Sequence, residues 1–495
     1  MSEGAPLADG LGDMDPQAFR EAALTLVDWI GRYLGGHDDY PVLAQVGPGD
    51  IRAALPGRAP EQGEPMREIL NDFERTLVPG LTHWNHPAFF AYFATSGSGP
   101  GVLAEFLTAA LNQQAMLWRT SPAATELEEV VLGWLRELLG LPPVFEGVIY
   151  DGGSASNLHA LVAAREVAVP GVRTRGLGAR HDGPALRVYC SEHAHLSVDK
   201  AVILLGLGHQ ALRKIPVDDE YRMQPRALEA AVREDEAAGA LPVAVVATVG
   251  TTSTSSVDPV PAIADVCEAR RLWLHVDASY AGPAAMLPER AWIFDGVSRA
   301  DSLVVNPHKW LFTPIDLSAF YCRRLDVLRA ALALTPDYLE TRESGTVHNL
   351  MDTGVALGRR FRALKLWMVL RYFGAAGLRS RLAEHIRLAQ LFSEWVDADS
   401  DFERLAPVPL SVVCFRAAPR GIAEQTLDRL NAELLERVNA SGKVFLSHTR
   451  LRGRLALRLA VGHIRTSESH IALAWRALRS ALSRTLEEGF DQAPA

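Results

Sequence analysis

Two segments, WLHVD (residues 273–277) and LVVNPHKW (residues 303–310), carry the clearest structural pattern in the chain. Each begins as a short apolar run and ends in polar residues, with Asp277 closing the first and Lys309 near the end of the second. Such runs are typical of strands that are buried on both faces of a parallel sheet. The spacing between Asp277 and Lys309 leaves room for one helical crossover and one strand. Both side chains are therefore expected just beyond strand ends.

The same pattern extends toward the N-terminus. Further apolar runs lie at residues 148–150, 186–190 and 243–249, and helical patterns lie at residues 225–238 and 260–271. Strands that alternate with helices predict an α/β domain with a mainly parallel sheet covered on both faces. Ligands of such sheets collect at the carboxyl ends of the strands. The residues that follow each strand are therefore the candidates for a functional site.

The regions on either side of this domain have different patterns. Residues 19–34 carry apolar side chains at helical spacing, and a Pro- and Gly-rich connection follows at residues 47–65. Such a helical arm must bury its apolar face elsewhere, and a partner subunit is the expected place. At the other end, strands are predicted at residues 411–415, 444–447 and 455–459, and helices at residues 357–372, 424–438 and 467–487. We expect three parts: an N-terminal arm and dimerisation segment (1–98), a large domain (99–374) and a small α+β C-terminal domain (375–495).

Composition narrows the class of protein. The chain has 495 residues, of which 48% are hydrophobic and 22% charged, and its net charge is −9. This charge disfavours nucleic-acid binding, which usually needs a basic face. The apolar runs are far shorter than the roughly 20 residues of a membrane span. The four cysteines are scattered and predict neither a zinc site nor a disulfide framework, so no metal is expected and a reducing cytoplasm fits best.

The segment DGGSASN (residues 151–157) follows the predicted strand at 148–150 and opens a helix. Glycines allow close approach of the backbone to a ligand, and the first N–H groups of a helix favour an anion. The hydroxyls of Ser154 and Ser156 add donors. A Gly-Gly turn between strand and helix is also a common structural feature. By itself, therefore, this segment is only a candidate phosphate cradle.

Asp277 and Lys309 suit opposite ends of a flat cofactor. A carboxylate at the end of an apolar strand can keep a ring nitrogen protonated, although it can also serve as a helix cap or a buried ion-pair partner. Lys309, flanked by His308 and Trp310, is expected in a partly desolvated place, which lowers the pKa of an amine and suits it to Schiff-base formation.

Two further segments face the same edge of the sheet. Residues 191–197 bring His193 and His195 to a strand end, where an imidazole can stack on a flat ring; zinc binding is the alternative, but no further ligands cluster nearby in sequence. Residues 248–254 add several hydroxyls. A phosphate cradle, a pyridinium partner, a lysine and a stacking histidine together match the needs of pyridoxal phosphate. The sequence predicts a pyridoxal-phosphate enzyme with a Schiff base on Lys309.

The chain resembles the group II pyridoxal-phosphate decarboxylases, most closely the aromatic-L-amino-acid decarboxylases, from about residue 19 to about residue 481. The resemblance rests on THW (82–84) through FFAYF (89–93), SPAATELE (121–128), GSAS (153–156), HVDA (275–278), NPHKW (306–310) and LGRRF (357–361). It implies the type I fold of pyridoxal-phosphate-dependent transferases. It also implies a homodimer with active sites at the subunit interface.

The resemblance also implies roles for individual residues. It implies that the phosphate is bound by Ala155, Ser156, Asn306 and His308. It implies that Thr252 lies near the ring and its 3′-oxygen. It also implies that Asp277 pairs with the pyridine nitrogen and that His195 stacks on the ring. Trp84, Tyr92, Phe93, Thr95 and His195 are implied to line the substrate pocket. Tyr338 matches a tyrosine on a mobile loop that protonates the substrate carbon after carbon dioxide leaves, a step that a phenol on a closing loop can perform while it excludes water.

We therefore predict decarboxylation of an aromatic L-amino acid to the amine. The alternatives are an aromatic aldehyde synthase, a decarboxylase of a non-aromatic amino acid and a non-catalytic protein that binds pyridoxal phosphate. The presence of Tyr338 favours the decarboxylase over the synthase. Gln114 and Met116 depart from the residues usual in animal relatives, so the ring type of the substrate stays open.

Overall fold

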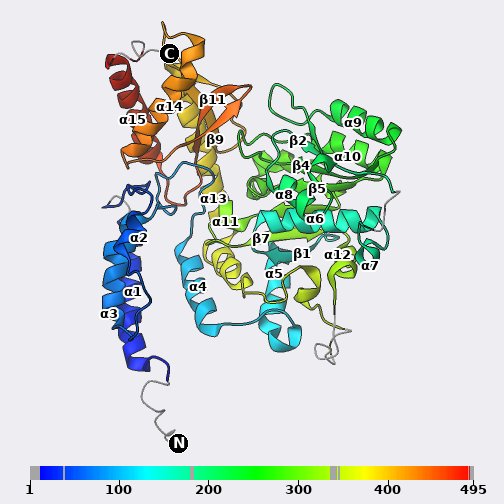
Figure 1. The fold of residues 1–495 in the computed structure, drawn as a ribbon, viewed down its shortest axis with the longest axis horizontal. Coiled ribbons are helices and arrows are strands. Elements are labelled where there is room, and N and C mark those ends of the chain that lie inside the picture. The colour runs from blue at the N-terminus through cyan, green and yellow to red at the C-terminus, as the bar shows by residue number, and fades with distance from the viewer. Residues whose placement is uncertain are drawn as a thin grey trace, which may run out of the picture.

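The computed structural model describes residues 12–36, 39–178, 183–334, 343, 346–488 and 490. Two sheets organise this part of the chain (Figure 1). The larger sheet has seven strands in the order β1-β7-β6-β5-β4-β2-β3, and the smaller sheet has four in the order β10-β11-β9-β8. The predicted α/β large part and small α+β C-terminal part are confirmed.

The large sheet is mainly parallel. Its strands are β1 (Glu146–Tyr150), β2 (Leu186–Ser191), β3 (Leu212–Ile215), β4 (Leu241–Thr248), β5 (Trp273–Asp277), β6 (Ser302–Val305) and β7 (Ser318–Cys322). Strands β2 to β6 pair in parallel, whereas β7 pairs antiparallel with both β6 and β1. The carboxyl ends of β1, β2, β4, β5 and β6 therefore lie at one edge. Strands β3 and β7 were not predicted, since β3 carries two charged side chains and β7 follows a proline-containing loop without a crossover helix.

Helices cover both faces of the large sheet, as predicted (Figure 1). They are α5 (Pro122–Leu138), α6 (Gly153–Ala168), α7 (Val172–Arg175), α8 (Ser197–Leu204), α9 (Pro225–Ala237), α10 (Val260–Arg270), α11 (Pro307–Trp310) and α12 (Leu325–Leu332). Helix α6 crosses the middle of the sheet and packs against β4, β5, β6 and β7. It starts directly after β1, so its N-terminus opens at the edge where the strands end.

The C-terminal part begins on a long helix that bends. Helix α13 (Ala363–Ala398) contains Gly374 with φ 61° and ψ 169°, a backbone conformation that interrupts the helix. After it come β8 (Phe402–Arg404), β9 (Val412–Ala417), α14 (Glu424–Ala440), β10 (Ser447–Leu451), β11 (Arg454–Ala460) and α15 (Glu468–Glu487). Two predicted bounds were wrong. The helix begins at Ala363 rather than 357, and the strand expected at 444–447 lies at β10, because Val444 and Leu446 are buried in loop conformation.

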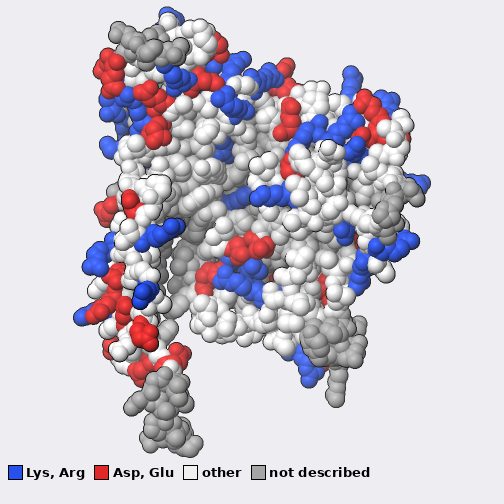
Figure 2. Space-filling model, in the orientation of Figure 1, with Lys and Arg blue, Asp and Glu red and all other residues white. Residues whose placement is uncertain are grey.

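The N-terminal segment forms an arm along one side of the molecule (Figures 1 and 2). It contains α1 (Pro16–Gly35), α2 (Asp50–Ala54) and α3 (Met66–Asp72), and α4 (Gly99–Leu111) follows. None of the residues in α1, α2 or α3 is buried in the single chain. Phe19, Leu24 and Val27 of α1 are 52%, 58% and 47% exposed. These three apolar side chains of the arm are therefore uncovered within the part of the chain that the structure describes.

Residues 88–91 belong to the C-terminal core although they lie early in the sequence. Phe89 forms a parallel bridge with Phe445, and the N–H of Phe90 donates to the carbonyl of Phe445 at 2.9 Å. Ala88, Phe89 and Phe90 are fully buried in the same hydrophobic cluster as Val413 and Leu457. The division of the chain at residues 98 and 374 stays a prediction.

Across the described ranges, no helix is both long enough and apolar enough to span a membrane.

Candidate active site

A cavity of about 290 Å³ opens at the carboxyl ends of the large-sheet strands. Residues at or after the ends of β1, β2, β4, β5 and β6 contribute to it, which is the arrangement expected for ligand sites of parallel sheets. Its lining includes Phe93, Asp151, Gly153, Ser154, His195, Thr248, Thr252, Asp277, Asn306, His308 and Lys309. The structure thus brings together Lys309, Asp277, His195, Thr252, Asn306, His308 and Phe93 from the predicted set.

The segment after β1 forms a tight turn into α6. A Cβ atom on Gly153 would lie 2.7 Å from Ser279 Oγ and 2.9 Å from Asn306 Nδ2, so only glycine fits there. Ser154 lines the cavity, whereas Ser156 is fully buried behind it, with its hydroxyl 2.8 Å from the hydroxyl of Ser318. The Ser318 hydroxyl in turn donates to Asn306 Oδ1 at 2.7 Å. Ala155 is also absent from the cavity lining. The first residues of the predicted cradle, 151–154, therefore line the cavity, and Ala155 and Ser156 lie behind them.

Asp277 is held by donors on both carboxylate oxygens. Asn157 Nδ2 donates to Oδ2 at 2.9 Å, and the N–H of Ser279 donates to Oδ1 at 3.0 Å. Burial alone would raise the pKa of Asp277, but Lys309, these two hydrogen bonds and His275 outweigh it and hold the pKa below its usual range. An ionised carboxylate at this place can stabilise a proton on the ring nitrogen of a heteroaromatic ligand.

Asn157 links Asp277 to His275 directly and to His195 through Ser197. Its Oδ1 is 2.9 Å from His275 Nε2, and its Nδ2 also donates to Ser197 Oγ at 2.8 Å. Burial lowers the pKa of His275 to about 4, so this ring is neutral. Asn157, Ser197 and Ser279 were not predicted as site residues. Asn157 belongs to the segment 151–157 already noted, but its partners lie far away in sequence.

His195 stands at the cavity wall after β2. The N–H of Ser197 donates to His195 Nδ1 at 3.2 Å, and the Ser197 hydroxyl lies 2.8 Å from the same nitrogen. Burial lowers the pKa of His195, Asp277 opposes this and Lys309 adds to it. Because Nδ1 accepts, the proton of the neutral ring is on Nε2. His193 faces elsewhere and packs edge-on against Tyr221.

Lys309 lies next to an aromatic ring and opposite an acid. Its Nζ is 5.7 Å from the ring centroid of Phe93. Burial lowers the pKa of Lys309, with Asp277 opposing that shift and Arg458 adding to it. A lower pKa raises the fraction of free amine, which is the form that attacks an aldehyde. The predicted desolvated environment of this lysine is therefore present.

His308 is fixed beside Lys309 in the neutral state. The N–H of Leu317 donates to His308 Nδ1 at 3.0 Å. Burial lowers the pKa of His308 to about 4, and the positive charges of Lys309 and Lys365 add to the effect. Its remaining nitrogen, Nε2, then carries the proton and can donate to an anion.

The predicted substrate residues are only partly assembled in the single chain. Phe93 lines the cavity and stacks on Tyr280 with ring centroids 3.7 Å apart. Trp84 and Tyr92 stack on each other at 5.7 Å and are 40% and 53% exposed, outside the cavity lining. Thr95 also lies outside that lining.

Gln114 and Met116 do not reach the cavity either. Gln114 Oε1 accepts from the N–H of Arg359 at 2.6 Å, so one atom of its amide has a structural partner. Met116 packs against Leu117 and Met351. Tyr338, the predicted proton donor, lies outside the described residues.

The residues present fit pyridoxal phosphate. The cavity combines a helix N-terminus at Ser154, an ionised Asp277 and an amine of lowered pKa at Lys309. The hydroxyl oxygen of Thr248, also in the lining, is buried and has no hydrogen-bond partner among the described residues. A buried polar atom without a partner is costly, so a ligand that supplies one is favoured.

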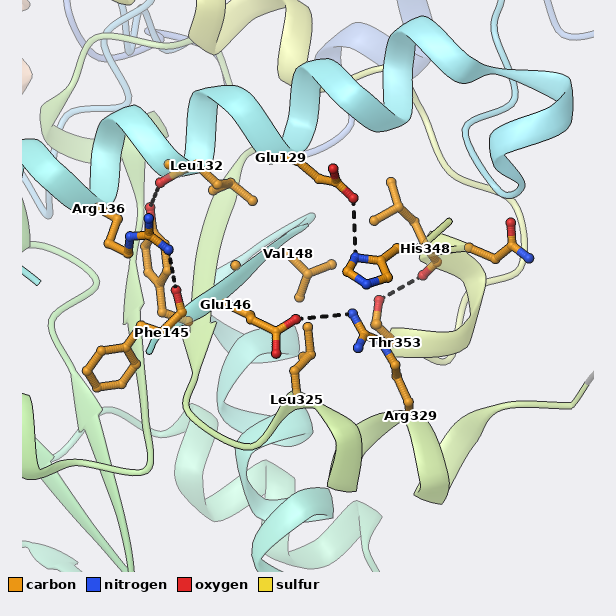
Figure 3. A pocket seen from close by; sticks show the side chains of 15 residues that line it. Glu129, Leu132, Arg136, Phe145, Glu146, Val148, Leu325, Arg329, His348 and Thr353 are labelled. Atoms are coloured by element: carbon orange, nitrogen blue, oxygen red, sulfur yellow. Dashed lines mark hydrogen bonds and ion pairs between the residues drawn. The ribbon is translucent and has the colours of Figure 1, made fainter. Parts of the chain in front are cut away.

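A second cavity, of about 190 Å³, lies on the outer side of β1 between α5 and η10 (Leu350–Thr353) (Figure 3). Its charged residues are already paired, Glu129 with His348 at 3.3 Å and Glu146 with Arg329 at 3.4 Å. It contains none of the predicted site residues. The cavity at the strand ends is therefore the candidate active site.

Comparisons with known proteins agree with this geometry. Residues 48–418 match the family model described as "Pyridoxal-dependent decarboxylase conserved domain". Tyrosine decarboxylase 2 of Arabidopsis thaliana is 41% identical, with 95% of this chain and 88% of that protein covered. Phenylacetaldehyde synthase of the same plant is 39% identical, with 97% and 98% covered. The crystal structure of Oryza sativa TDC with PLP and tryptamine has a TM-score of 0.92 at 36% identity and covers 96% of this chain and 99% of that one. The type I fold is thereby confirmed.

Proposed function

Because this chain belongs to the pyridoxal-dependent decarboxylase family, we propose that it removes the carboxylate of an aromatic L-amino acid as carbon dioxide and releases the amine. One observation carries the proposal: a single cavity holds Lys309, Asp277 and the aromatic ring of Phe93. The family and the relatives that act on tyrosine-type and tryptophan-type substrates support it.

Pyridoxal phosphate is the cofactor of this family, and when bound it supplies a conjugated ring that accepts the electron pair left by the departing carboxylate. Lys309 supplies the amine that holds its aldehyde carbon. Asp277 keeps a proton on the ring nitrogen, which preserves the positive charge that attracts those electrons. Ser154, Asn306 and His308 are proposed to donate hydrogen bonds to the phosphate, together with the backbone at Ala155 and Ser156.

The remaining roles concern the substrate and the protons. His195 is proposed to pack on the ring face, and Thr252 to lie near the 3′-oxygen. Tyr338 is proposed to deliver a proton to the substrate Cα after carbon dioxide leaves, and to exclude water as its loop closes. Phe93, Trp84, Tyr92 and Thr95 are proposed to surround the aromatic ring of the substrate.

The direct test incubates purified protein loaded with pyridoxal phosphate with L-DOPA, L-tryptophan, L-tyrosine and L-phenylalanine. L-Glutamate and L-cysteine sulfinate serve as non-aromatic controls. Carbon dioxide and product mass are measured together. We expect release of carbon dioxide and the matching amine from at least one aromatic substrate. Turnover of the acidic amino acids alone would overturn the substrate assignment, and turnover of none would overturn the reaction.

An aromatic aldehyde synthase is the second candidate, because phenylacetaldehyde synthase of Arabidopsis thaliana is among the similar proteins. That reaction consumes oxygen and water and yields aldehyde, ammonia and hydrogen peroxide along with carbon dioxide. Tyr338 supports the decarboxylase, since a phenol that protonates Cα competes with attack by oxygen. Peroxide formed in step with carbon dioxide would favour the synthase instead.

We propose a homodimer with active sites at the subunit interface. The exposed apolar residues of α1 support it, as do Leu103, Phe106 and Leu107 of α4, which are 58%, 45% and 45% exposed. Exposed apolar surface on this scale is typical of an interface. Mass photometry should give a dimer. Leu24→Glu should yield monomer with lower activity, whereas a wild-type monomer with full activity would contradict the proposal.

A cytoplasmic location is proposed on the state of the cysteines. Cys190, Cys267, Cys322 and Cys414 are all buried and free. Four unpaired thiols are typical of a reducing compartment.

A further inference from the structure

The outer edge of β1 lacks a neighbouring strand. The sheet order places β1 at one end, so β7 is its only strand partner within the described ranges. In an antiparallel pair, every second residue points its N–H and C=O away from the partner. At Ile149 two side chains meet these groups. The N–H of Ile149 donates to Glu128 Oε1 at 2.8 Å, and its C=O accepts from Arg359 Nη2 at 2.6 Å.

Glu128 and Arg359 form a buried ion pair in which Nη2 and Oε1 are 2.8 Å apart and the side chains are 3% and 7% exposed. A buried ion pair often contributes little net stability compared with apolar residues of the same size. Stability alone is therefore a poor reason for charge at this place. What the pair supplies is one acceptor and one donor, the two groups that a neighbouring strand would offer to Ile149.

Arg359 is itself fixed by its backbone. Its N–H donates to Gln114 Oε1 at 2.6 Å, and its C=O accepts from the N–H of Ala115 at 2.8 Å. Upstream, the hydroxyl of Tyr150 donates to the carbonyl of Thr353, and the N–H of Val355 donates to His159 Nε2 at 3.1 Å. Residues 353–359 therefore run beside the carboxyl end of β1 and are tied to β1 and α6.

Helix α5 covers the rest of this edge (Figure 3). Arg136 donates to the carbonyl of Phe145 at 3.1 Å, just before β1 begins, while Glu128 on the same helix acts at Ile149. The second cavity lies between these two points and borders residues 146–148. The ion pair thus acts where β1 leads into the active site, not at its distant end.

The path from Ile149 to the phosphate cradle is short. Only Tyr150 separates Ile149 from residues 151–154 of the cradle. Tyr150 is in register with Ser318, whose hydroxyl contacts both Ser156 at 2.8 Å and Asn306 at 2.7 Å. A displacement of β1 at Ile149 would therefore move the cradle relative to Asn306.

We propose that Arg359 and Glu128 are positioning residues that replace a neighbouring strand at Ile149 and so hold the cradle at the spacing that the cofactor phosphate requires. The role rests on the proposed function, specifically on the assignment of residues 154–156 and Asn306 to the phosphate. It accounts for the Arg359 position in the LGRRF segment, which does not line the active-site cavity.

The test measures equilibrium dissociation constants of pyridoxal phosphate and of phosphate-free pyridoxal for apoenzyme variants, followed by absorbance. Arg359→Met should raise the dissociation constant of pyridoxal phosphate roughly 10-fold or more, and that of pyridoxal less than about 2-fold. The dissociation constant of pyridoxal phosphate for Arg359→Lys should lie between those of the wild type and Arg359→Met. The reason is that an ammonium can still reach either Glu128 or the carbonyl of Ile149.

Arg416→Met is the matched control. Arg416 lies on β9, its side chain is 3% exposed against 7% for Arg359, and it pairs with Glu403 and Glu424 at 2.5 Å and 2.9 Å. It should lower the urea midpoint as Arg359→Met does, yet leave both dissociation constants unchanged. Hydrogen exchange in the apoenzymes should be faster at the amides of residues 150–157 in Arg359→Met only. If Arg359→Met does not fold, Glu128→Gln with Arg359→Gln removes both charges at similar volume and is expected to show the same phosphate-selective loss.

Asn306→Ala separates the two proposals. If Asn306→Ala weakens pyridoxal phosphate selectively while both Arg359 variants bind it as the wild type does, the positioning role is overturned and the cradle stands. If Asn306→Ala leaves the preference for the phosphate form intact, the cradle assignment itself fails and the positioning role fails with it.

Discussion

The two sides of the candidate active site differ in how completely one chain builds them. On the cofactor side, Asp277, Asn157 and His275 are buried and joined by hydrogen bonds of 2.9 Å. On the substrate side, Phe93 and His195 are the two of the five predicted pocket residues that line the cavity, while Trp84 and Tyr92 stand half exposed outside it. The chemistry of the cofactor is therefore encoded within one folded chain. Completion of the substrate pocket needs further surface, which the proposed dimer would supply.

The largest effect is expected at Lys309, the residue proposed to bind the cofactor covalently. Lys309→Ala should reduce carbon dioxide release by roughly 10³-fold or more, since no other amine in the cavity can hold the aldehyde. Borohydride treatment followed by peptide mass analysis should attach the cofactor to Lys309 in the wild type and to no lysine in the variant. Lys200→Ala is the control, because Lys200 is exposed on α8. Attachment to another lysine in wild-type protein would show that Lys309 is the wrong residue.

Asp277→Asn should have the next largest effect. The substitution keeps the shape of the side chain and the contact with Ser279 but removes the charge that keeps the ring nitrogen protonated, so kcat should fall about 10²- to 10³-fold. The absorption spectrum of bound cofactor should change with it. Asp265→Asn on the exposed face of α10 is the control, because Asp265 pairs only with the surface residue Arg299 among its described contacts. Equal kcat values for Asp277→Asn and the wild type would refute the role.

Acid should lower the free energy of unfolding, because three buried histidines are neutral in the folded protein. Burial lowers the pKa of His275, His308 and His385 to about 4. Between about pH 4 and 6.5 the unfolded chain therefore binds more protons than the folded one, so stability rises with pH across this window. Acidification from pH 7 to pH 5 should cost ~2 kcal/mol per histidine in the free energy of unfolding.

The measurement is urea unfolding of the apoenzyme at several pH values. His385→Asn keeps an acceptor for the indole N–H of Trp310, which lies 2.9 Å from His385 Nδ1, and should flatten the pH dependence. An unchanged slope in this variant would remove His385 from the explanation.

The smallest effect is expected on the substrate side. Tyr92→Ala should raise KM for the preferred aromatic substrate about 10-fold with little change in kcat, because it removes binding surface and leaves the cofactor side intact. Trp292→Ala, an aromatic residue that is 47% exposed in η7 (Pro288–Phe294), should change neither constant. A large fall in kcat for Tyr92→Ala would mean that the two sides are not separable as described.

The sequence was most informative where chemistry depends on neighbours in the chain. Lys309, Asp277 and the 151–154 turn could be predicted because each lies at the end of an apolar strand or within four residues after it. Strand β7 could not, since its five residues pair antiparallel and break the strand–helix alternation. Nor could the Asn157 hub, whose carboxylate partner is 120 residues away. The sequence connects Gln114 with the ring type of the substrate, but the contact of Gln114 with Arg359 forms only when distant segments meet.

Residues 88–91 lie early in the sequence but pack against Phe445, and this has a consequence for folding during synthesis. A ribosome delivers this segment long before the strand and loop against which it packs, so Phe89 and Phe90 stay without their native cover through most of synthesis. Contacts between such distant residues form late and leave apolar surface open to aggregation. A fragment that ends near residue 374 would leave Phe89 and Phe90 without this cover, so we expect it to aggregate.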